Sequence, residues 1–294
     1  MPSELWDFFW TNRPLLNQLG KLAAHCIKTL ADKKGITPGI FIAIHTFGRD
    51  LKRNVHVHLL TTCGGLSKDK SQWKPLYFDQ ATLMRLWRYQ LITLFRNHYA
   101  KKLLVIPAKL AQTLHAHFTF NQFLDHLYPK TWIVHCAKPS HNPKLNISYL
   151  GRYVKRPAIA ESKLKHYDGH DVTFNYLDHT TKTYRTFKLS AQEFIARFVQ
   201  HIPNIHFRMI RYYGFLAHRV SGQLLPQVYQ LLNQTPDATT SQPTFASLIQ
   251  KHFGYHPLAC ILCGQPLELS ASYFGATTAI LLANHRSLAL LKKI

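Results

Sequence analysis

Two short apolar runs near the N-terminus constrain the fold more than any other feature of the sequence. They span Gly39–Thr46 and Val55–Thr62, are rich in β-branched residues, and are separated by the charged segment Arg49–Asn54. Runs of this composition joined by a polar turn predict an antiparallel pair of strands. We therefore expect an antiparallel sheet at the centre of the fold.

The rest of the chain mixes helices with strands. Apolar residues at helical spacing predict four helices, over Trp10–Lys33, Asp79–Tyr99, Leu145–Lys155 and Ala191–His201, the last of them capped by Ser190. Strand-like composition predicts three further strands, over Thr131–Cys136, Asp171–Asp178 and Lys182–Leu189, the last two forming a hairpin. The expected fold class is α+β, with a central antiparallel sheet flanked by helices.

A polar, turn-rich stretch over Thr235–Pro243 indicates a linker. With 294 residues the chain exceeds the usual size of one domain. We therefore expect a main domain over residues 1–234, followed over residues 235–294 by the linker and a small helical tail.

The charge of the chain points to a polyanionic partner. It carries 36 Lys and Arg residues against 14 Asp and Glu residues, a formal net charge of +22. Such a charge costs self-repulsion unless a polyanion offsets it, so nucleic acid is the expected partner. The longest apolar run is too short to span a membrane, the N-terminus lacks the pattern of a secretory signal, and the five cysteines imply no disulfide framework. A cytoplasmic location is expected.

His56 and His58 are separated by one residue on the second predicted strand. Because side chains alternate between the faces of a strand, both imidazoles point to the same side and can bind one divalent ion. Either Asp50 or His45 is positioned to supply a third ligand, and the sequence does not choose between them. With 19 histidines in the chain, the motif alone is also compatible with chance.

Tyr149 and Tyr153 lie four residues apart on the predicted helix Leu145–Lys155, so both phenols share one helix face. A phenolate is a competent nucleophile at phosphorus, and Arg152, Lys155 and Arg156 would bind the phosphate backbone beside it. Alone, the pair also fits ordinary helix packing. Together with the histidines it favours metal-dependent phosphoryl transfer.

The combination resembles the HUH superfamily of single-strand nucleases, and more of the chain resembles its two-tyrosine rolling-circle insertion-sequence transposases of the ninety-one type. The segments that carry this resemblance are His45–Leu51, His56–Leu60, Cys63–Leu66, Ser148–Tyr153 and Arg211–Arg219. The resemblance implies that His56 and His58 bind Mg²⁺ or Mn²⁺ and that Tyr149 and Tyr153 attack single-stranded DNA. The expected product is a covalent 5′-phosphotyrosine intermediate, formed at transposon ends at the bacterial nucleoid.

The sequence departs from this family at two places. No cysteine-rich, zinc-binding module precedes Trp6, so the chain looks truncated, and Asn54 stands where relatives commonly carry another histidine. The alternatives that stay open are a truncated remnant that binds DNA without cutting it, and a rolling-circle replication initiator or relaxase.

Two weaker signals complete the candidate sites. Cys260 and Cys263 have the spacing of half a zinc site, which His252, His256 or His285 would complete. Arg211 and Tyr212 are expected to contact DNA, the tyrosine by stacking on a base.

Overall fold

The structure, a computed structural model, describes residues 1–114, 117–137, 151, 158–178, 181–235, 244–260, 262–267, 279–280 and 283. The chain divides into two compact units, Met1–Thr235 and Pro236–Ile294. None of the described helices combines the length and hydropathy that crossing a membrane requires.

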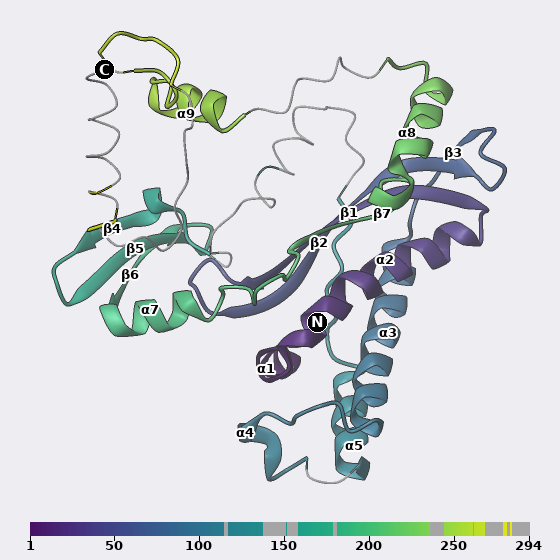
Figure 1. Cartoon of the computed structure of the whole chain (residues 1–294). Coiled ribbons are helices and arrows are strands. Elements are labelled where there is room, and N and C mark those ends of the chain that lie inside the picture. Colours follow the sequence, from purple (N-terminus) through teal and green to yellow (C-terminus); the bar gives the residue numbers. More distant parts are fainter. Residues whose placement is uncertain are drawn as a thin grey trace. The chain divides into compact units, whose positions relative to one another are not determined.

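A four-stranded antiparallel sheet lies at the centre of the larger unit (Figure 1). Its strands, in spatial order, are β3 (Trp73–Pro75), β2 (Arg53–Ser67), β1 (Ile36–Phe47) and β7 (Ile210–Gly214). The predicted antiparallel pair is confirmed as β1 and β2, each longer than expected. Strand β7 was not predicted from the sequence, and it forms one edge of the sheet.

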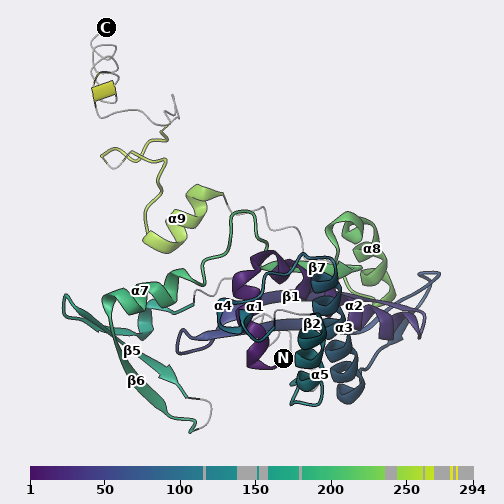
Figure 2. The same cartoon turned by 90° about the horizontal axis from the view of Figure 1, so that it is seen from below.

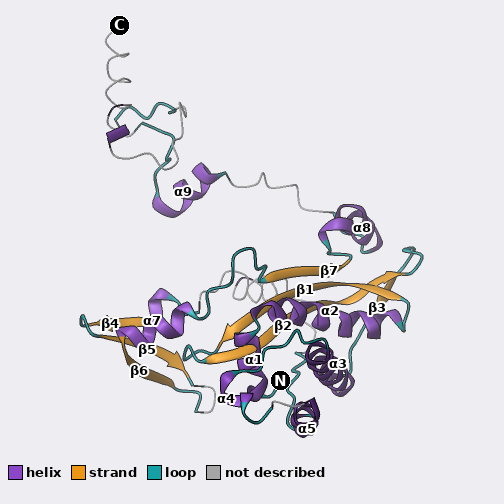
Figure 3. Cartoon of the chain, turned by 60° about the horizontal axis from the view of Figure 1, so that its bottom comes forward, coloured by secondary structure: helices purple, strands orange, loops and turns teal. Residues whose placement is uncertain are grey.

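Helices pack on one face of this sheet, as Figure 3 shows for α2 (Leu16–Asp32) below β1 and β2. Ile40, Ile42 and Ile44 alternate along β1, and all three are fully buried against Ala23, Ala24 and Ile27 of α2. Trp10 belongs instead to the separate helix α1 (Trp6–Thr11). The predicted helix is interrupted because Asn12 leaves the helical conformation and exchanges hydrogen bonds with the backbone of Val105.

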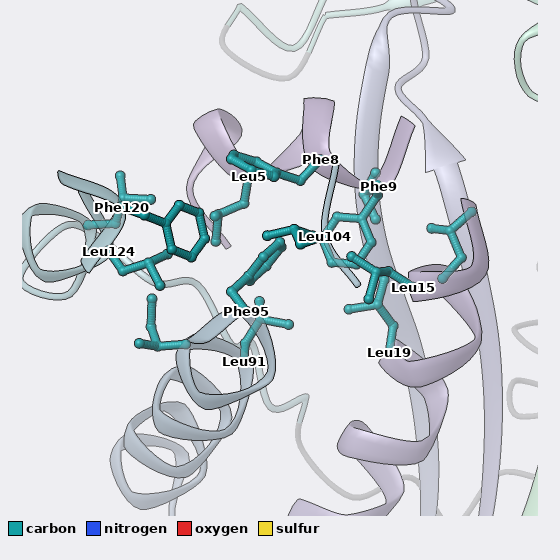
Figure 4. Packing of buried hydrophobic residues seen from close by; sticks show 14 of the residues in the cluster. Leu5, Phe8, Phe9, Leu15, Leu19, Leu91, Phe95, Leu104, Phe120 and Leu124 are labelled. Atoms are coloured by element: carbon teal, nitrogen blue, oxygen red, sulfur yellow. The ribbon is translucent and has the colours of Figure 1, made fainter. Parts of the chain in front are cut away.

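An aromatic cluster fills the space between α1, α3 (Gln80–Ala100) and α5 (His117–Leu127), as Figure 4 shows. The ring of Phe8 lies edge-on to Phe95 at 5.4 Å and to Phe120 at 6.1 Å between centroids. Asp79 caps α3 by accepting a hydrogen bond from the amide of Thr82, which confirms the predicted start of this helix. Short helices complete this region: η1 (Ser3–Leu5), η2 (Arg13–Leu15) and α4 (Ala108–Ala111).

The strand predicted over Thr131–Cys136 is wrong. This segment has no regular secondary structure, and no described strand pairs with it. Its apolar residue Trp132 is buried in the helical cluster and donates a hydrogen bond to the carbonyl of Leu127. Burial of Trp132 against helices, rather than strand pairing, accounts for the apolar composition of the segment.

A second, three-stranded antiparallel sheet consists of β4 (Leu164–Tyr167), β5 (Asp171–Leu177) and β6 (Tyr184–Ser190), preceded by η3 (Glu161–Lys163). The predicted hairpin is confirmed as β5 and β6. Helix α7 (Ala191–Val199) packs against both strands, and Ser190 caps it as predicted (Figure 2).

Leu51, at the turn between β1 and β2, connects the two sheets. It is fully buried and packs with Ile159, Phe174 and Leu189. His201, just after α7, donates from Nε2 to the carbonyl of Leu51 at 2.9 Å. The end of the β1–β2 pair is therefore held against the second sheet by both apolar and polar contacts.

Two further helices follow β7: α8 (His218–Leu231) in the larger unit and α9 (Phe245–Phe253) in the smaller one. The observed α+β class and the helix in the tail agree with the predicted fold. The helix predicted over Leu145–Lys155 lies outside the described residues, except for Gly151.

Candidate metal centre and nucleic-acid groove

The face of the β1–β2 pair that carries His56 and His58 is the face opposite α2. Val55 and Val57 alternate with the histidines and pack into the apolar clusters on the helical side. The alternation of side chains along β2 therefore turns both imidazoles away from the helices. This confirms the prediction that the two histidines share one face.

His45 on β1 joins them. In the antiparallel register His45 lies opposite His56, and Ala43 lies opposite His58. One ligating nitrogen from each of the three histidines lies within 4.8 Å of the others. The ring centroid of His45 is 5.5 Å from that of His56 and 4.8 Å from that of His58. His45 is buried, whereas His56 and His58 are partly exposed, so an ion bound here would be open to solvent and substrate on one side.

A hydrogen bond orients His56. Its Nδ1 lies 2.8 Å from the backbone carbonyl of Asn54, and because a carbonyl only accepts, Nδ1 must carry the proton. In the neutral ring Nε2 then has the lone pair that a metal ion requires. Residue 54 thus orients His56 through its backbone carbonyl, so this hydrogen bond does not depend on which side chain stands at position 54.

Asp50, the other candidate for the third ligand, is not part of this cluster of described residues. Its carboxylate accepts a hydrogen bond from the backbone amide of Lys52 at 3.2 Å and forms an ion pair with the side-chain ammonium of Lys52 at 3.5 Å. These contacts stabilise the turn between β1 and β2. Of the two candidates, the fold places His45 beside His56 and His58.

Arg211 and Tyr212 lie on the edge strand β7, with their side chains on opposite faces. Tyr212 is opposite Phe41 in the register and so faces the histidine side, whereas Arg211 faces α2. The guanidinium of Arg211 donates to the backbone and side chain of Asn17 and to the carbonyl of Arg208. Arg211 is therefore held by the protein, while the ring of Tyr212 is 38% exposed.

Two hollows lie beside β7. One, of about 310 Å³, is lined by Arg13, Thr46 and His201 among others, and the second, of about 360 Å³, by Arg208, Arg211 and Tyr212 among others. Asn17 and His206 line both. We call the two together the β7 groove.

Sequence comparison identifies the family of the chain. A sequence profile for the family described as "Putative transposase" matches residues 39–223, which is more than half of the chain. The chain belongs to this transposase family.

Two relatives support the assignment. The transposase is 37% identical over 295 residues to the "Transposase for insertion sequence element IS801" of Pseudomonas savastanoi pv. phaseolicola, an alignment that covers 100% of this chain and 71% of that protein. It is 29% identical over 294 residues to the "Putative transposase y4qJ" of Sinorhizobium fredii (strain NBRC 101917 / NGR234), covering 95% and 73% of the two chains. No solved structure matches it.

The matched span of the transposase contains both candidate motifs and the β7 strand. The predicted nucleophiles Tyr149 and Tyr153 and the neighbouring cations Arg152, Lys155 and Arg156 lie outside the described residues. Their roles stay predictions that rest on the motif and on the family resemblance.

Cys260 and Cys263 lie in the smaller unit of the transposase, beyond the matched span. The amide of Gly264 donates to the carbonyl of Cys260, the amide of Cys260 donates to the carbonyl of Gln265, and Gly264 has φ of +71°. Among the described residues no third ligand gathers with these two thiols. A zinc ion here stays a prediction.

The sequence did not indicate the remaining residues of the β7 groove. Arg13 belongs to η2, while His206 and Arg208 precede β7 in an irregular segment. Arg13 forms no local motif with the other two, because most of the chain lies between them. The one available signal was the run Arg208-Met209-Ile210-Arg211-Tyr212-Tyr213, in which two arginines enclose two apolar residues and two tyrosines follow.

Proposed function

We propose that this transposase cuts and rejoins single-stranded DNA in a metal-dependent reaction that passes through a covalent 5′-phosphotyrosine. The observation that carries the proposal is the convergence of His45, His56 and His58 on one face of the central sheet. Three imidazoles from adjacent strands form a metal-binding group, and the family assignment supplies the DNA substrate.

The donor atoms favour Mn²⁺ over Mg²⁺, the two ions expected from the family resemblance. All three ligating groups of the cluster are imidazoles. Mg²⁺ prefers oxygen ligands, whereas imidazole nitrogen suits transition ions. When bound, such an ion polarises a phosphoryl oxygen and holds the phosphate in line for attack.

Tyr149 and Tyr153 are the proposed nucleophiles. The phenolic oxygen of one tyrosine forms a bond to phosphorus, the bond from phosphorus to the 3′ oxygen breaks, and that oxygen takes up a proton to become a free 3′-hydroxyl. The phenol gives up its own proton in the same step. The number of phosphoester bonds is unchanged, so a 3′-hydroxyl can later reverse the reaction and transfer the strand without ATP.

Arg152, Lys155 and Arg156 are proposed to bind the DNA backbone beside the tyrosines and, as nearby positive charges, to favour the phenolate. Among the rolling-circle enzymes that the sequence resembles, transposition is favoured over replication initiation because both relatives described above are named as transposases.

The test uses circular single-stranded DNA that carries the sequences flanking the gene. We expect the wild-type protein to linearise it with Mn²⁺ and not in EDTA, and the His56→Ala/His58→Ala variant to be inactive with either. The matched control is His25→Ala/His126→Ala, which removes two exposed histidines from α2 and α5 and should leave cutting unchanged. Cutting by the His56→Ala/His58→Ala variant in EDTA would disprove the metal assignment.

A further inference from the structure

The β7 groove is lined by cations. Its charged or ionisable residues include Arg13, Arg208, Arg211, His206 and His218. In the part of the chain that the structure describes, neither hollow is lined by Asp or Glu. A lining of one sign produces a focused positive potential, which attracts a polyanion.

Arg13 has hydrogen-bonding capacity left over. Its Nη2 donates to the carbonyl of Ile202 at 2.7 Å, and its guanidinium lies over the ring of Trp10 at 4.9 Å. Its Nη1 is buried and has no hydrogen-bond partner among the described residues. Burial lowers the pKa of Arg13 but leaves it charged. Because an unsatisfied buried donor is costly, a side-chain movement that brought Nη1 to a phosphate oxygen in the hollow would be favourable.

Arg208 and Arg211 differ in their availability. Arg211 is bonded to Asn17 and forms a fixed, charged wall. Arg208 is exposed, and the structure describes no carboxylate paired with it. Its guanidinium can therefore bind a ligand without losing an ion pair inside the protein.

Tyr212 provides a flat surface beside these cations. Its ring lies edge-on to Phe41 at 5.5 Å and to His218 at 5.1 Å, so two neighbours fix its orientation while part of it stays exposed. Gly214, with φ of +64°, allows the chain to turn sharply from β7 towards α8. Only glycine fits at this position, because a Cβ would lie 1.7 Å from the carbonyl oxygen of Pro38. This turn brings His218 back to Tyr212.

Tyr212 places one side of the groove on the sheet face that carries the three histidines. Tyr212 lies opposite Phe41, four residues before His45 on the same face of β1, which corresponds to about 13 Å along the strand. Thr46, which lines the other hollow, follows His45 and therefore points to the opposite face, towards α2.

We propose that the β7 groove binds the sugar–phosphate backbone of single-stranded DNA through Arg13 and Arg208, and that Tyr212 stacks on a base of the same strand. This deepens the proposed function, on which it rests, by assigning a path for the strand around the β7 edge of the sheet, from the α2 side to the face that carries the three histidines. A single strand fits better than a duplex because its unpaired bases are available for stacking on an aromatic ring.

The test measures equilibrium binding of fluorescein-labelled oligo(dT) by anisotropy in EDTA, over a range of salt concentrations. Arg208→Gln should lower the slope of log affinity against log salt by about 0.7, which makes binding about fivefold weaker at 0.1 M salt than for the wild type. The matched control is Lys74→Gln, which removes one exposed cation from β3 at the opposite edge of the sheet and should bind as the wild type does.

Tyr212 is tested in the same assay. Tyr212→Phe keeps the ring and should retain affinity, whereas Tyr212→Leu should bind about fivefold to a hundredfold more weakly, because base stacking is lost. Equal binding by Arg208→Gln and Lys74→Gln, or no binding by the wild type, overturns the groove proposal; equal binding by Tyr212→Leu and Tyr212→Phe overturns the stacking.

Failure of the groove is distinguishable from failure of the proposed function. Binding is measured without metal and without cutting, so a protein that linearises DNA but binds oligo(dT) independently of Arg208 refutes only the groove. A protein whose binding depends on Arg208 but that never cuts DNA retains the groove and refutes the nuclease.

Discussion

His45 on β1 lies directly opposite His56 on β2 in the antiparallel register. Opposite residues of an antiparallel pair share one face of the sheet and have neighbouring Cβ atoms. The register therefore brings a histidine that is isolated in the sequence next to a His-x-His motif, and the three imidazoles form the cluster on which the proposed function rests.

The first prediction concerns the third ligand. His45→Ala should weaken Mn²⁺ binding, measured by isothermal titration calorimetry. Loss of a residue that only orients a metal ligand weakens binding roughly 10- to 100-fold, and loss of a ligand itself should weaken it at least as much. Asp50→Asn is the comparison, because it removes the carboxylate of the other candidate ligand. Asp50 lies outside the histidine cluster, so this variant should bind Mn²⁺ as the wild type does. Normal binding by His45→Ala together with weak binding by Asp50→Asn would reverse the assignment.

The second prediction concerns the division of labour between the tyrosines. If Tyr149 and Tyr153 act in sequence, Tyr149→Phe and Tyr153→Phe should each retain some covalent DNA adduct but lose strand transfer. The double variant should form no adduct, since Phe removes only the nucleophilic oxygen.

The adduct is detected as a gel shift that survives denaturant, with the modified residue mapped by mass spectrometry. Tyr89→Phe, at an exposed tyrosine of α3, is the control and should behave as the wild type does. An adduct on any third tyrosine would show that the tyrosine motif was misinterpreted.

The third prediction concerns the contact between the two sheets. Leu51→Ala should lower the free energy of unfolding by about 2–5 kcal/mol, because it leaves a cavity against Phe174 and Leu189. Urea denaturation measures the change. Leu103→Ala is the control: that side chain is 63% exposed, so we expect a change within about 0.5 kcal/mol. Equal effects of the two substitutions would mean that Leu51 does not hold the sheets together.

The fourth prediction concerns pH. Burial lowers the pKa of His201 below its ordinary value of 6.5, and the charges of Arg13 and Arg53 lower it further. The neutral ring accepts from Thr46 at 3.2 Å and donates to Leu51. Below pH 6.5 the unfolded chain takes up this proton before the folded one does, so the stability that His201 contributes is complete above that pH and falls as the pH drops towards the folded-state pKa.

The loss from this one group is at most about 1.4 kcal/mol per pH unit. In urea denaturation at pH 7.5, 6.5 and 5.5, His201→Gln should therefore lose less stability between the last two values than the wild type does. Equal pH dependence of the two proteins would show that His201 does not report on the junction between the sheets.

The parts of the fold that depend on local pattern could be predicted from the sequence. The β1–β2 pair, the β5–β6 hairpin and the capped helices α3 and α7 were predicted because strand alternation, helical spacing and capping side chains act over a few neighbouring residues. The shared face of His56 and His58 follows from the same alternation. Where apolar composition has more than one explanation, prediction failed, as for Trp132, which is buried against helices.

Only the tertiary structure decided which distant residues meet. The choice of His45 over Asp50 depends on the register between β1 and β2, since a shift of one residue would turn a histidine to the other face. The β7 groove depends on the pairing of β7 with β1, which brings Arg208 and Tyr212 beside Asn17 of α2. Register and long-range pairing are set by the packing of the whole domain rather than by any local sequence. The pattern alone therefore identified two candidate ligands and left the third open, and the structure places His45 rather than Asp50 beside them.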